Sequence, residues 1–169
     1  MLKITKNKFK LLGTEWTVLD RTEKGFLCIA DSIGDKVFDD NSNDWRNSEL
    51  RSYLNEAYLQ KLEAAVGVEN IIPLERDLLS LDGQTEYGSC EDKVSLLTVD
   101  EYRKYRSLLP NTGDWWWLIT PWSTPCNDYH YTVTVVAPSG GILRRSSNGD
   151  SGVRPFCIFN SSIFESEGK

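Results

Sequence analysis

The sequence predicts a single α+β domain over residues 1–169, built from a mostly antiparallel sheet and two or three helices. Segments with the apolar spacing of helices fall in the first two thirds of the chain, whereas β-forming segments dominate the last third. Helices and strands do not alternate in the βαβ pattern of a parallel sheet. A chain of 169 residues can bury one hydrophobic core but is short for two domains.

The first third predicts a hairpin followed by a helix. Residues 14–19 and 25–29 are rich in β-forming residues and flank a polar turn at residues 20–24. A helix is expected from Ser48, a good N-cap residue, because the apolar residues that follow it recur at helical spacing. These residues are Leu50, Tyr53, Leu54, Ala57, Tyr58, Leu62 and Ala65.

The polar run at residues 39–44 predicts a solvated turn that leads into this helix. Its oxygen-bearing side chains resemble those of a calcium loop. An EF-hand loop, however, needs glycine at its sixth position and a bidentate glutamate at its twelfth, where this chain has Asp44 and Leu50. We therefore expect no calcium site in this run.

The middle of the chain predicts two short apolar segments, an exposed loop and a second helix. The apolar segments are residues 71–74 and 94–97, and the polar character of residues 77–92 predicts an exposed loop between them. Thr98 can cap a helix whose first turn is acidic. In the last third, strands are expected at residues 115–119, 131–136, 142–145 and 153–159.

Composition narrows the classes of function. The chain has 25 Asp and Glu residues against 19 Lys and Arg, a formal charge of −6, so neither direct nucleic-acid binding nor a membrane surface is expected. No apolar run approaches the ~18 residues that span a bilayer, and the N-terminal residues lack the apolar core of a signal peptide. The expected location is the cytoplasm, or the virion if a phage encodes the protein.

The sequence lacks the common catalytic and metal-binding motifs. His130 is the only histidine, and the chain has no GxSxG, GxGxxG or GxxxxGK motif. Its cysteines are far apart and form no CxxC pair, so we expect reduced thiols without a bound metal. Neither enzyme activity nor a cofactor is expected. The four cysteines are Cys28, Cys90, Cys126 and Cys157.

Three segments are more specific than a generic globular sequence. They are residues 45–55 (WRNSELRSYLN), residues 92–102 (DKVSLLTVDEY), and residues 116–121 (WWLITP) followed by residues 152–155 (GVRP). In order and spacing they resemble, over nearly the whole chain, an uncharacterised domain family of bacterial and phage proteins with W-x-x-S-x-L-R-x-x-L-N, L-L-S/T-x-x-E, W-W-L-R-S/T-P and G-V-R-P motifs. That family in turn resembles the C-type-lectin-like fold of formylglycine-generating enzymes and of phage receptor-binding variable proteins. Ile119 stands where the family usually has arginine, so no role of that arginine transfers to this chain.

The motif residues predict a scaffold. Trp45, Trp116 and Trp117 offer large apolar areas for burial, and Arg154 can brace several backbone carbonyls with its five N–H donors. Because successive residues of a strand point to opposite faces, we expect one of the two adjacent tryptophans on each side of a sheet.

The resemblance implies that irregular segments between the late strands form a binding surface on this scaffold. Here these segments are residues 122–131 and 139–151, rich in the Tyr, Trp, Ser, Asn and Arg side chains that antibody paratopes and binding hot spots favour. We expect their aromatic residues and arginines to share one exposed face. The candidate partner-binding residues are Trp122, Asn127, Tyr129, His130, Tyr131, Arg144, Arg145 and Asn148.

The resulting hypothesis is a non-enzymatic protein that binds a macromolecular partner, in the first instance another protein, and the oligomeric state stays open. Calcium-dependent sugar binding is not expected, because the Glu-Pro-Asn, Gln-Pro-Asp and Trp-Asn-Asp motifs of sugar-binding lectins are missing. One alternative is an oxidase similar to formylglycine-generating enzymes, which would need Cys126 and Cys157. The other is a small acidic inhibitor from a phage or mobile element that blocks the nucleic-acid groove of a host defence protein, as anti-CRISPR proteins do. Its candidate carboxylates are Glu75, Asp77, Asp82 and Glu86.

Overall fold

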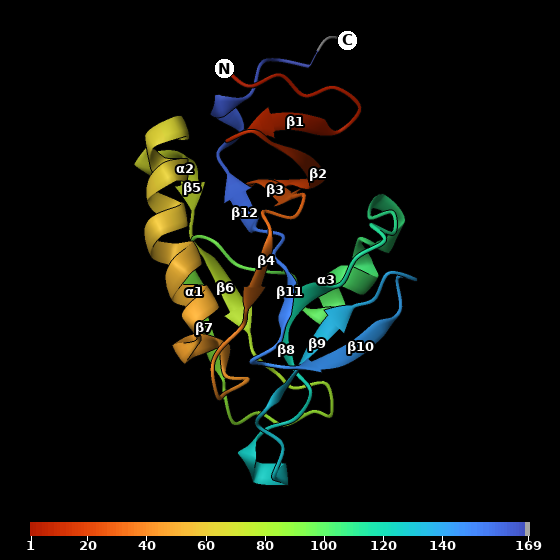
Figure 1. The fold of residues 1–169 in the computed structure, drawn as a ribbon. Helices are drawn as coiled ribbons and strands as arrows, with labels where there is room; N and C mark the ends of the chain where they lie inside the picture. The colour runs from red at the N-terminus through yellow and green to blue at the C-terminus, as the bar shows by residue number, and fades with distance from the viewer. Residues whose placement is uncertain (168–169) are drawn as a thin grey trace.

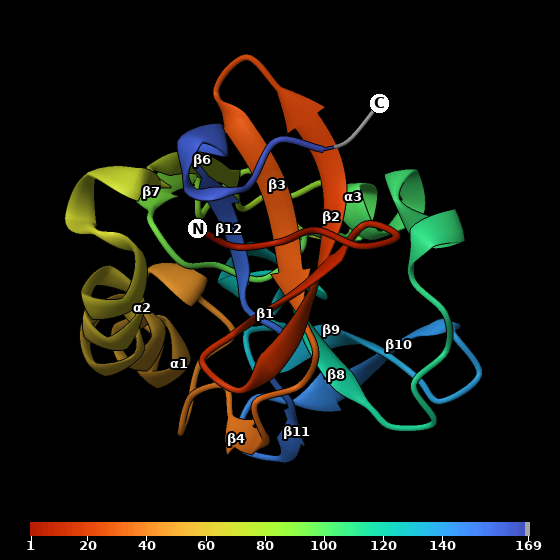
Figure 2. The same cartoon turned by 90° about the horizontal axis from the view of Figure 1, so that it is seen from above.

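The computed structural model describes residues 1–167 and shows an α+β arrangement with mostly antiparallel sheets (Figures 1 and 2). The first sheet joins the two ends of the chain and has five strands, each antiparallel to its neighbours. Figure 2 shows its central strands side by side. In spatial order the strands are β1 (Lys8–Leu11), β2 (Thr14–Thr22), β3 (Gly25–Ala30), β12 (Phe156–Phe159) and β5 (Ile71–Ile72).

The second sheet collects the late strands. It is antiparallel except where β11 meets β8 in a short parallel pairing. A separate two-stranded ribbon pairs β6 (Leu74–Asp77) with β7 (Ser89–Asp92). In spatial order the second sheet contains β10 (Ile142–Ser146), β9 (Thr132–Val136), β8 (Trp116–Pro121), β11 (Asp150–Gly152) and β4 (Asp35–Val37).

The predicted N-terminal hairpin is confirmed as β2 and β3, with a tighter turn than expected. β2 continues to Thr22, so only Glu23 and Lys24 connect the strands instead of residues 20–24. Gly25 follows with a φ of 146°, and an added Cβ there would collide with the backbone oxygen of Phe159. The glycine therefore lets β3 approach β12 closely.

The predicted helix is confirmed as one continuous element that begins after Ser48. It consists of α1 (Glu49–Tyr53), a π-helical turn η2 (Leu54–Tyr58) and α2 (Leu59–Val66). The Ser48 side chain accepts a hydrogen bond from the Arg51 N–H at 3.1 Å, as an N-cap residue should. The helix lies along one side of the molecule in Figure 1, and its apolar face is buried in the core.

The second helix, α3 (Val99–Lys104), is also confirmed. Thr98 and Glu101 form a reciprocal capping box, in which each side chain accepts from the other residue's backbone N–H. The short 3-10 helices are η1 (Trp45–Asn47), η3 (Val68–Asn70), η4 (Arg106–Leu108), η5 (Pro125–Asn127) and η6 (Ser161–Ile163).

The prediction of an exposed loop at residues 77–92 is wrong in part. Residues 89–92 form β7, and Leu78, Tyr87 and Asp92 are buried. The buried Asp92 has partners for its charge, because its carboxylate accepts from Trp45 Nε1 and Arg51 Nε, both at 2.7 Å. Polarity predicts exposure only where such partners are absent.

The strand predicted at residues 153–159 is confirmed only over residues 156–159, which form β12, and the three residues before Val153 form the separate strand β11. β11 pairs with β4 and β8 in the second sheet, whereas β12 pairs with β3 and β5 in the first. Residues 153–155 cross from one sheet to the other, and Pro155 lies in this crossing, where no strand pairing requires its missing N–H.

Buried side chains form two apolar clusters, one on each side of β8. Trp117 belongs to the first cluster together with Trp45, and Trp116 belongs to the second. All three tryptophans are buried, which confirms their predicted scaffold role and the opposite orientation of the adjacent pair. Arg154 is buried as well, but among residues 1–167 its side chain donates a hydrogen bond to only one carbonyl, that of Ala30, instead of several. No helix within residues 1–167 has the length and apolar character needed to cross a membrane.

Candidate partner-binding site at the late loops

Residues 122–131, which we call the tip, form the end of the molecule opposite β1 (Figure 1). The tip connects β8 to β9 and contains η5. Asp128 ends η5 in a left-handed conformation with a φ of 56°, which aspartate tolerates better than most residues. The chain then returns so that the Tyr129 N–H donates to the Thr124 carbonyl at 3.1 Å.

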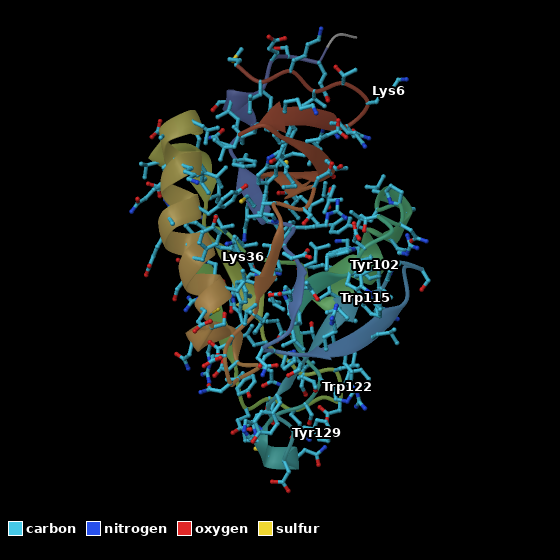
Figure 3. All side chains as sticks on the ribbon, in the orientation of Figure 1. Lys6, Lys36, Tyr102, Trp115, Trp122 and Tyr129 are labelled. Atoms are coloured by element: carbon cyan, nitrogen blue, oxygen red, sulfur yellow. The ribbon has the colours of Figure 1, made fainter. Side chains whose placement is uncertain are left out.

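Two aromatic rings of the tip hold one arginine of β10 between them. The guanidinium carbon of Arg144 lies 4.8 Å from the ring centroid of Trp122 and 5.8 Å from that of Tyr129. We call these three residues the aromatic–arginine cluster; Figure 3 labels its two aromatic members. Tyr129 is 43% exposed, so the cation–π contacts place Arg144 against an accessible aromatic ring.

His130 and Tyr131 extend the aromatic surface. Their ring centroids are 3.7 Å apart, and Tyr131 is 53% exposed. The Nδ1 atom of His130 is buried and has no hydrogen-bond partner among the described residues. The backbone oxygen of His130 accepts a hydrogen bond from the Asn43 N–H at 2.9 Å, which fixes the end of the tip.

The expectation of one face shared by all the arginines and aromatics is wrong for Arg145. In β10, Arg144 lies opposite Thr134 and Arg145 opposite Val133, so the two adjacent side chains leave the sheet on different faces. Arg145 instead lies over Trp115, with its guanidinium carbon 5.4 Å from the ring centroid. The two arginines therefore do not form a single cationic surface.

Each of the remaining two predicted residues makes a side-chain hydrogen bond. The exposed Asn148 lies in the turn after β10, and its side-chain oxygen accepts from the Ser146 hydroxyl at 2.7 Å. Asn127 lies in η5 and donates from Nδ2 to Asp82 at 3.2 Å. Asn127 is thus part of the tip, whereas Asn148 belongs to a neighbouring turn.

Asn43 ties the two ends of the tip together and was not predicted from the sequence. Its fully buried side chain donates from Nδ2 to the carbonyls of Ser123, at 2.8 Å, and Thr132, at 2.9 Å. Its Oδ1 atom accepts from the Tyr87 hydroxyl at 2.6 Å. Asn43 belongs to the polar run that predicts a solvated turn, and nothing in its local sequence indicates burial. Its burial depends on hydrogen bonds to Ser123 and Thr132, which lie 80 and 89 positions away in the chain.

Two of the acidic residues proposed for an inhibitor surface brace the tip. Asp82 accepts hydrogen bonds from the Ser123 hydroxyl at 2.6 Å and from Asn127, and Glu86 accepts from the backbone N–H of Cys126 at 3.0 Å. Burial raises the pKa of Asp82, but the hydrogen bonds to its carboxylate have the larger combined effect, so the pKa is lowered. Hydrogen bonds from Cys126 lower the pKa of Glu86. A carboxylate whose pKa is lowered on folding loses its stabilising contribution as the pH falls through the folded pKa, so acid weakens these braces.

The other two acidic candidates, Glu75 and Asp77, are exposed on β6 and line a cavity of about 380 Å³ next to α3. No group of three or more His, Cys, Asp or Glu side chains within residues 1–167 is arranged to hold a metal ion.

The structure does not bring Cys126 and Cys157, the pair that an oxidase would need, together. Cys126 is exposed in η5, whereas Cys157 is fully buried in β12 opposite Cys28 of β3. Burial raises the pKa of Cys157 well above the ordinary thiol value, which disfavours the nucleophilic thiolate.

All four cysteines are free thiols, and we expect them to differ strongly in reactivity. A thiol reagent should modify Cys126 first in the native protein, Cys90 more slowly because burial raises its pKa to about 11, and the buried Cys28 and Cys157 only after unfolding. Timed labelling followed by peptide mass spectrometry checks this order, and denatured protein should yield four thiols. Fast native labelling of Cys157 would contradict the packing of β12.

Comparison of the chain with models of known protein families, with curated proteins and with solved structures finds no match.

Proposed function

We propose that this protein is a non-enzymatic binding module that recognises a protein partner through its tip. The observation that carries the proposal is the aromatic–arginine cluster, in which two tip aromatics hold Arg144 over their rings. Trp, Tyr and Arg are the residue types that dominate binding energy in protein interfaces. Rigid aromatic rings also lose little conformational entropy when a partner covers them.

The bracing of the tip supports the same function. Asn43 and Glu86 hydrogen-bond to its backbone, and Asp82 accepts from its Ser123 hydroxyl. A surface that is already ordered avoids much of the entropic cost of binding. The formal charge of −6 and the carboxylates beside the tip favour a protein partner over a nucleic acid, whose phosphates they would repel.

We further propose that the arrangement is C-type-lectin-like, as the sequence resemblance implies. Two features support this: both ends of the chain contribute to the first sheet, and the late strands of the second sheet present the irregular segments. In proteins with that fold such segments usually form the binding surface. The tip and the turn after β10 occupy this position here.

Alanine variants of the cluster test the proposal once a partner has been captured from the native host with the tagged protein. We expect Trp122→Ala, Tyr129→Ala and Arg144→Ala each to weaken binding by about 2 kcal/mol or more, roughly 30-fold. Isothermal titration with the purified partner measures the affinity, and an unchanged melting temperature shows that the fold is intact.

Arg145→Ala is the matched control, because it removes the same side chain from the adjacent position on the other face of β10. It should leave the affinity within about twofold of the wild type. If the cluster variants bind normally while Glu75→Gln and Asp77→Asn abolish binding, the tip is not the site and the acidic inhibitor becomes the better account.

A further inference from the structure

A second site candidate lies away from the tip, between the second sheet and the segment that leads into β8. The structure contains here a cavity of about 350 Å³, a size typical of small-molecule sites. Trp115, whose half-buried ring borders the cavity, lies apart from Trp122 and Tyr129 in Figure 3. The lining residues that matter for recognition are Trp115, Trp116, Arg154, Asp31, Asp35 and Asp114.

Arg154 is a buried cation with too few partners. The residue is only 4% exposed, and its guanidinium donates one hydrogen bond, from Nε to the Ala30 carbonyl at 3.0 Å. Its Nη1 atom is buried without a partner among residues 1–167, and its Nη2 atom lies 3.6 Å from the Asp31 carboxylate, too far for a good hydrogen bond. Burial lowers the pKa of Arg154, which reflects the cost of keeping this charge out of water.

Arg154 is one of the residues that line the cavity. The guanidinium carbon is 4.8 Å from the ring centroid of Trp116, so the ring supports one side of the group. A buried guanidinium normally uses several of its five donors, and carboxylate oxygens are the acceptors that fit its planar geometry best. An entering carboxylate would supply the acceptors that the protein does not.

The rest of the lining has the opposite charge. Asp31 follows β3, Asp35 begins β4 and Asp114 precedes β8, and all three are exposed around the cavity. With Arg154 included, the ionisable lining residues carry a formal charge of −2. A simple anion would therefore be repelled at the entrance, whereas a simple amine would meet the positive charge of Arg154 inside.

We propose that this cavity binds a free basic α-amino acid of the lysine or arginine type. Its carboxylate pairs with Arg154, its cationic groups lie among Asp31, Asp35 and Asp114, and its methylene chain packs against Trp115. Such a ligand satisfies the buried guanidinium and balances the excess negative charge at the same time. This site is independent of partner binding at the tip.

Titration of the ¹⁵N-labelled protein with L-lysine and L-arginine tests the proposal, because indole N–H signals report on each of the six tryptophans. We expect saturable shifts of the Trp115 and Trp116 signals and constant signals from Trp16 and Trp45, which are buried elsewhere. Asp35→Asn and Asp114→Asn remove exposed carboxylates without disturbing the core, and each should weaken binding about tenfold. Asp77→Asn removes an exposed carboxylate outside the cavity and should change nothing.

Cadaverine, which has both amines of lysine but no carboxylate, is the decisive comparison ligand. The proposal expects it to bind at least about tenfold more weakly than L-lysine, because Arg154 then gains no acceptor. Equal binding of cadaverine would overturn the role of Arg154. The absence of saturable shifts with L-lysine and L-arginine, or equal shifts in the Asp35→Asn and Asp114→Asn variants, would overturn the site itself.

Discussion

Replacing Trp117 by alanine is expected to lower the free energy of unfolding by about 3–5 kcal/mol, the usual cost of deleting a fully buried tryptophan. The side chain lies in the first apolar cluster, with its ring centroid 5.6 Å from that of Phe38. Its Nε1–H donates to the Lys36 carbonyl at 2.8 Å and so ties β8 to β4 across the sheet. Alanine leaves a cavity and an unpaired carbonyl. Thermal unfolding should show a drop of about 10 °C or more.

Two companion variants separate the causes of this loss. Trp117→Phe keeps most of the apolar volume but loses the indole N–H, so it should cost only about 1–2 kcal/mol. Trp122→Ala removes a tryptophan from the surface and should change stability by less than about 1 kcal/mol. A Trp117→Ala variant as stable as Trp122→Ala would contradict the burial of Trp117 in the first apolar cluster.

Replacing Asp92 by alanine should destabilise the protein by about 3 kcal/mol, because two donors lose a buried acceptor at once. Asp92 is buried in β7, and its carboxylate accepts from the Trp45 Nε1–H and the Arg51 Nε–H, both at 2.7 Å. These bonds attach the start of the long helix to the ribbon of β6 and β7. Chemical denaturation measures the loss.

Asp92→Asn is the conservative comparison, since its side-chain oxygen can still accept one of the two hydrogen bonds. It should retain at least half of the stability that Asp92→Ala loses, and Glu91→Ala, at the exposed neighbouring position, should be nearly neutral. Equal stability of all three variants would mean that the Asp92 pairings do not hold the helix in place.

Elements specified by neighbouring residues could be predicted from the sequence. The long helix follows from its apolar spacing and its Ser48 cap, and α3 follows from the Thr98 and Glu101 capping box. The division of residues 150–159 between two sheets could not be predicted, because pairing with β4, β8, β3 and β5 decides it and those strands lie far away in the chain. Local β propensity favours only β12 (FCIF), because the Asp-Ser-Gly residues of β11 are poor strand formers.

The candidate site shows the same limit. Trp122, Tyr129 and Arg144 could be selected by residue type, since exposed aromatics and arginine are typical of binding surfaces. Their mutual contact, and the separation of Arg145 onto the other face, depend on the register of β10 with β9. The role of Asn43 could not be predicted, because its partners are carbonyls far away in the chain that come together only on folding.

Site-specific photo-crosslinking in the native host can show whether the partner binds at the tip. A photoreactive phenylalanine analogue in place of Tyr131 lies at the tip beside the aromatic–arginine cluster without replacing any of its members. The same analogue in place of Val68, which is 54% exposed in η3, probes the surface that follows α2; in Figure 1, α2 lies toward the end of the molecule opposite the tip. Binding through the tip predicts that the partner captured by the wild type is crosslinked from position 131 and not from position 68. Crosslinking of that partner from position 68 alone, or capture without any crosslink from position 131, would contradict it.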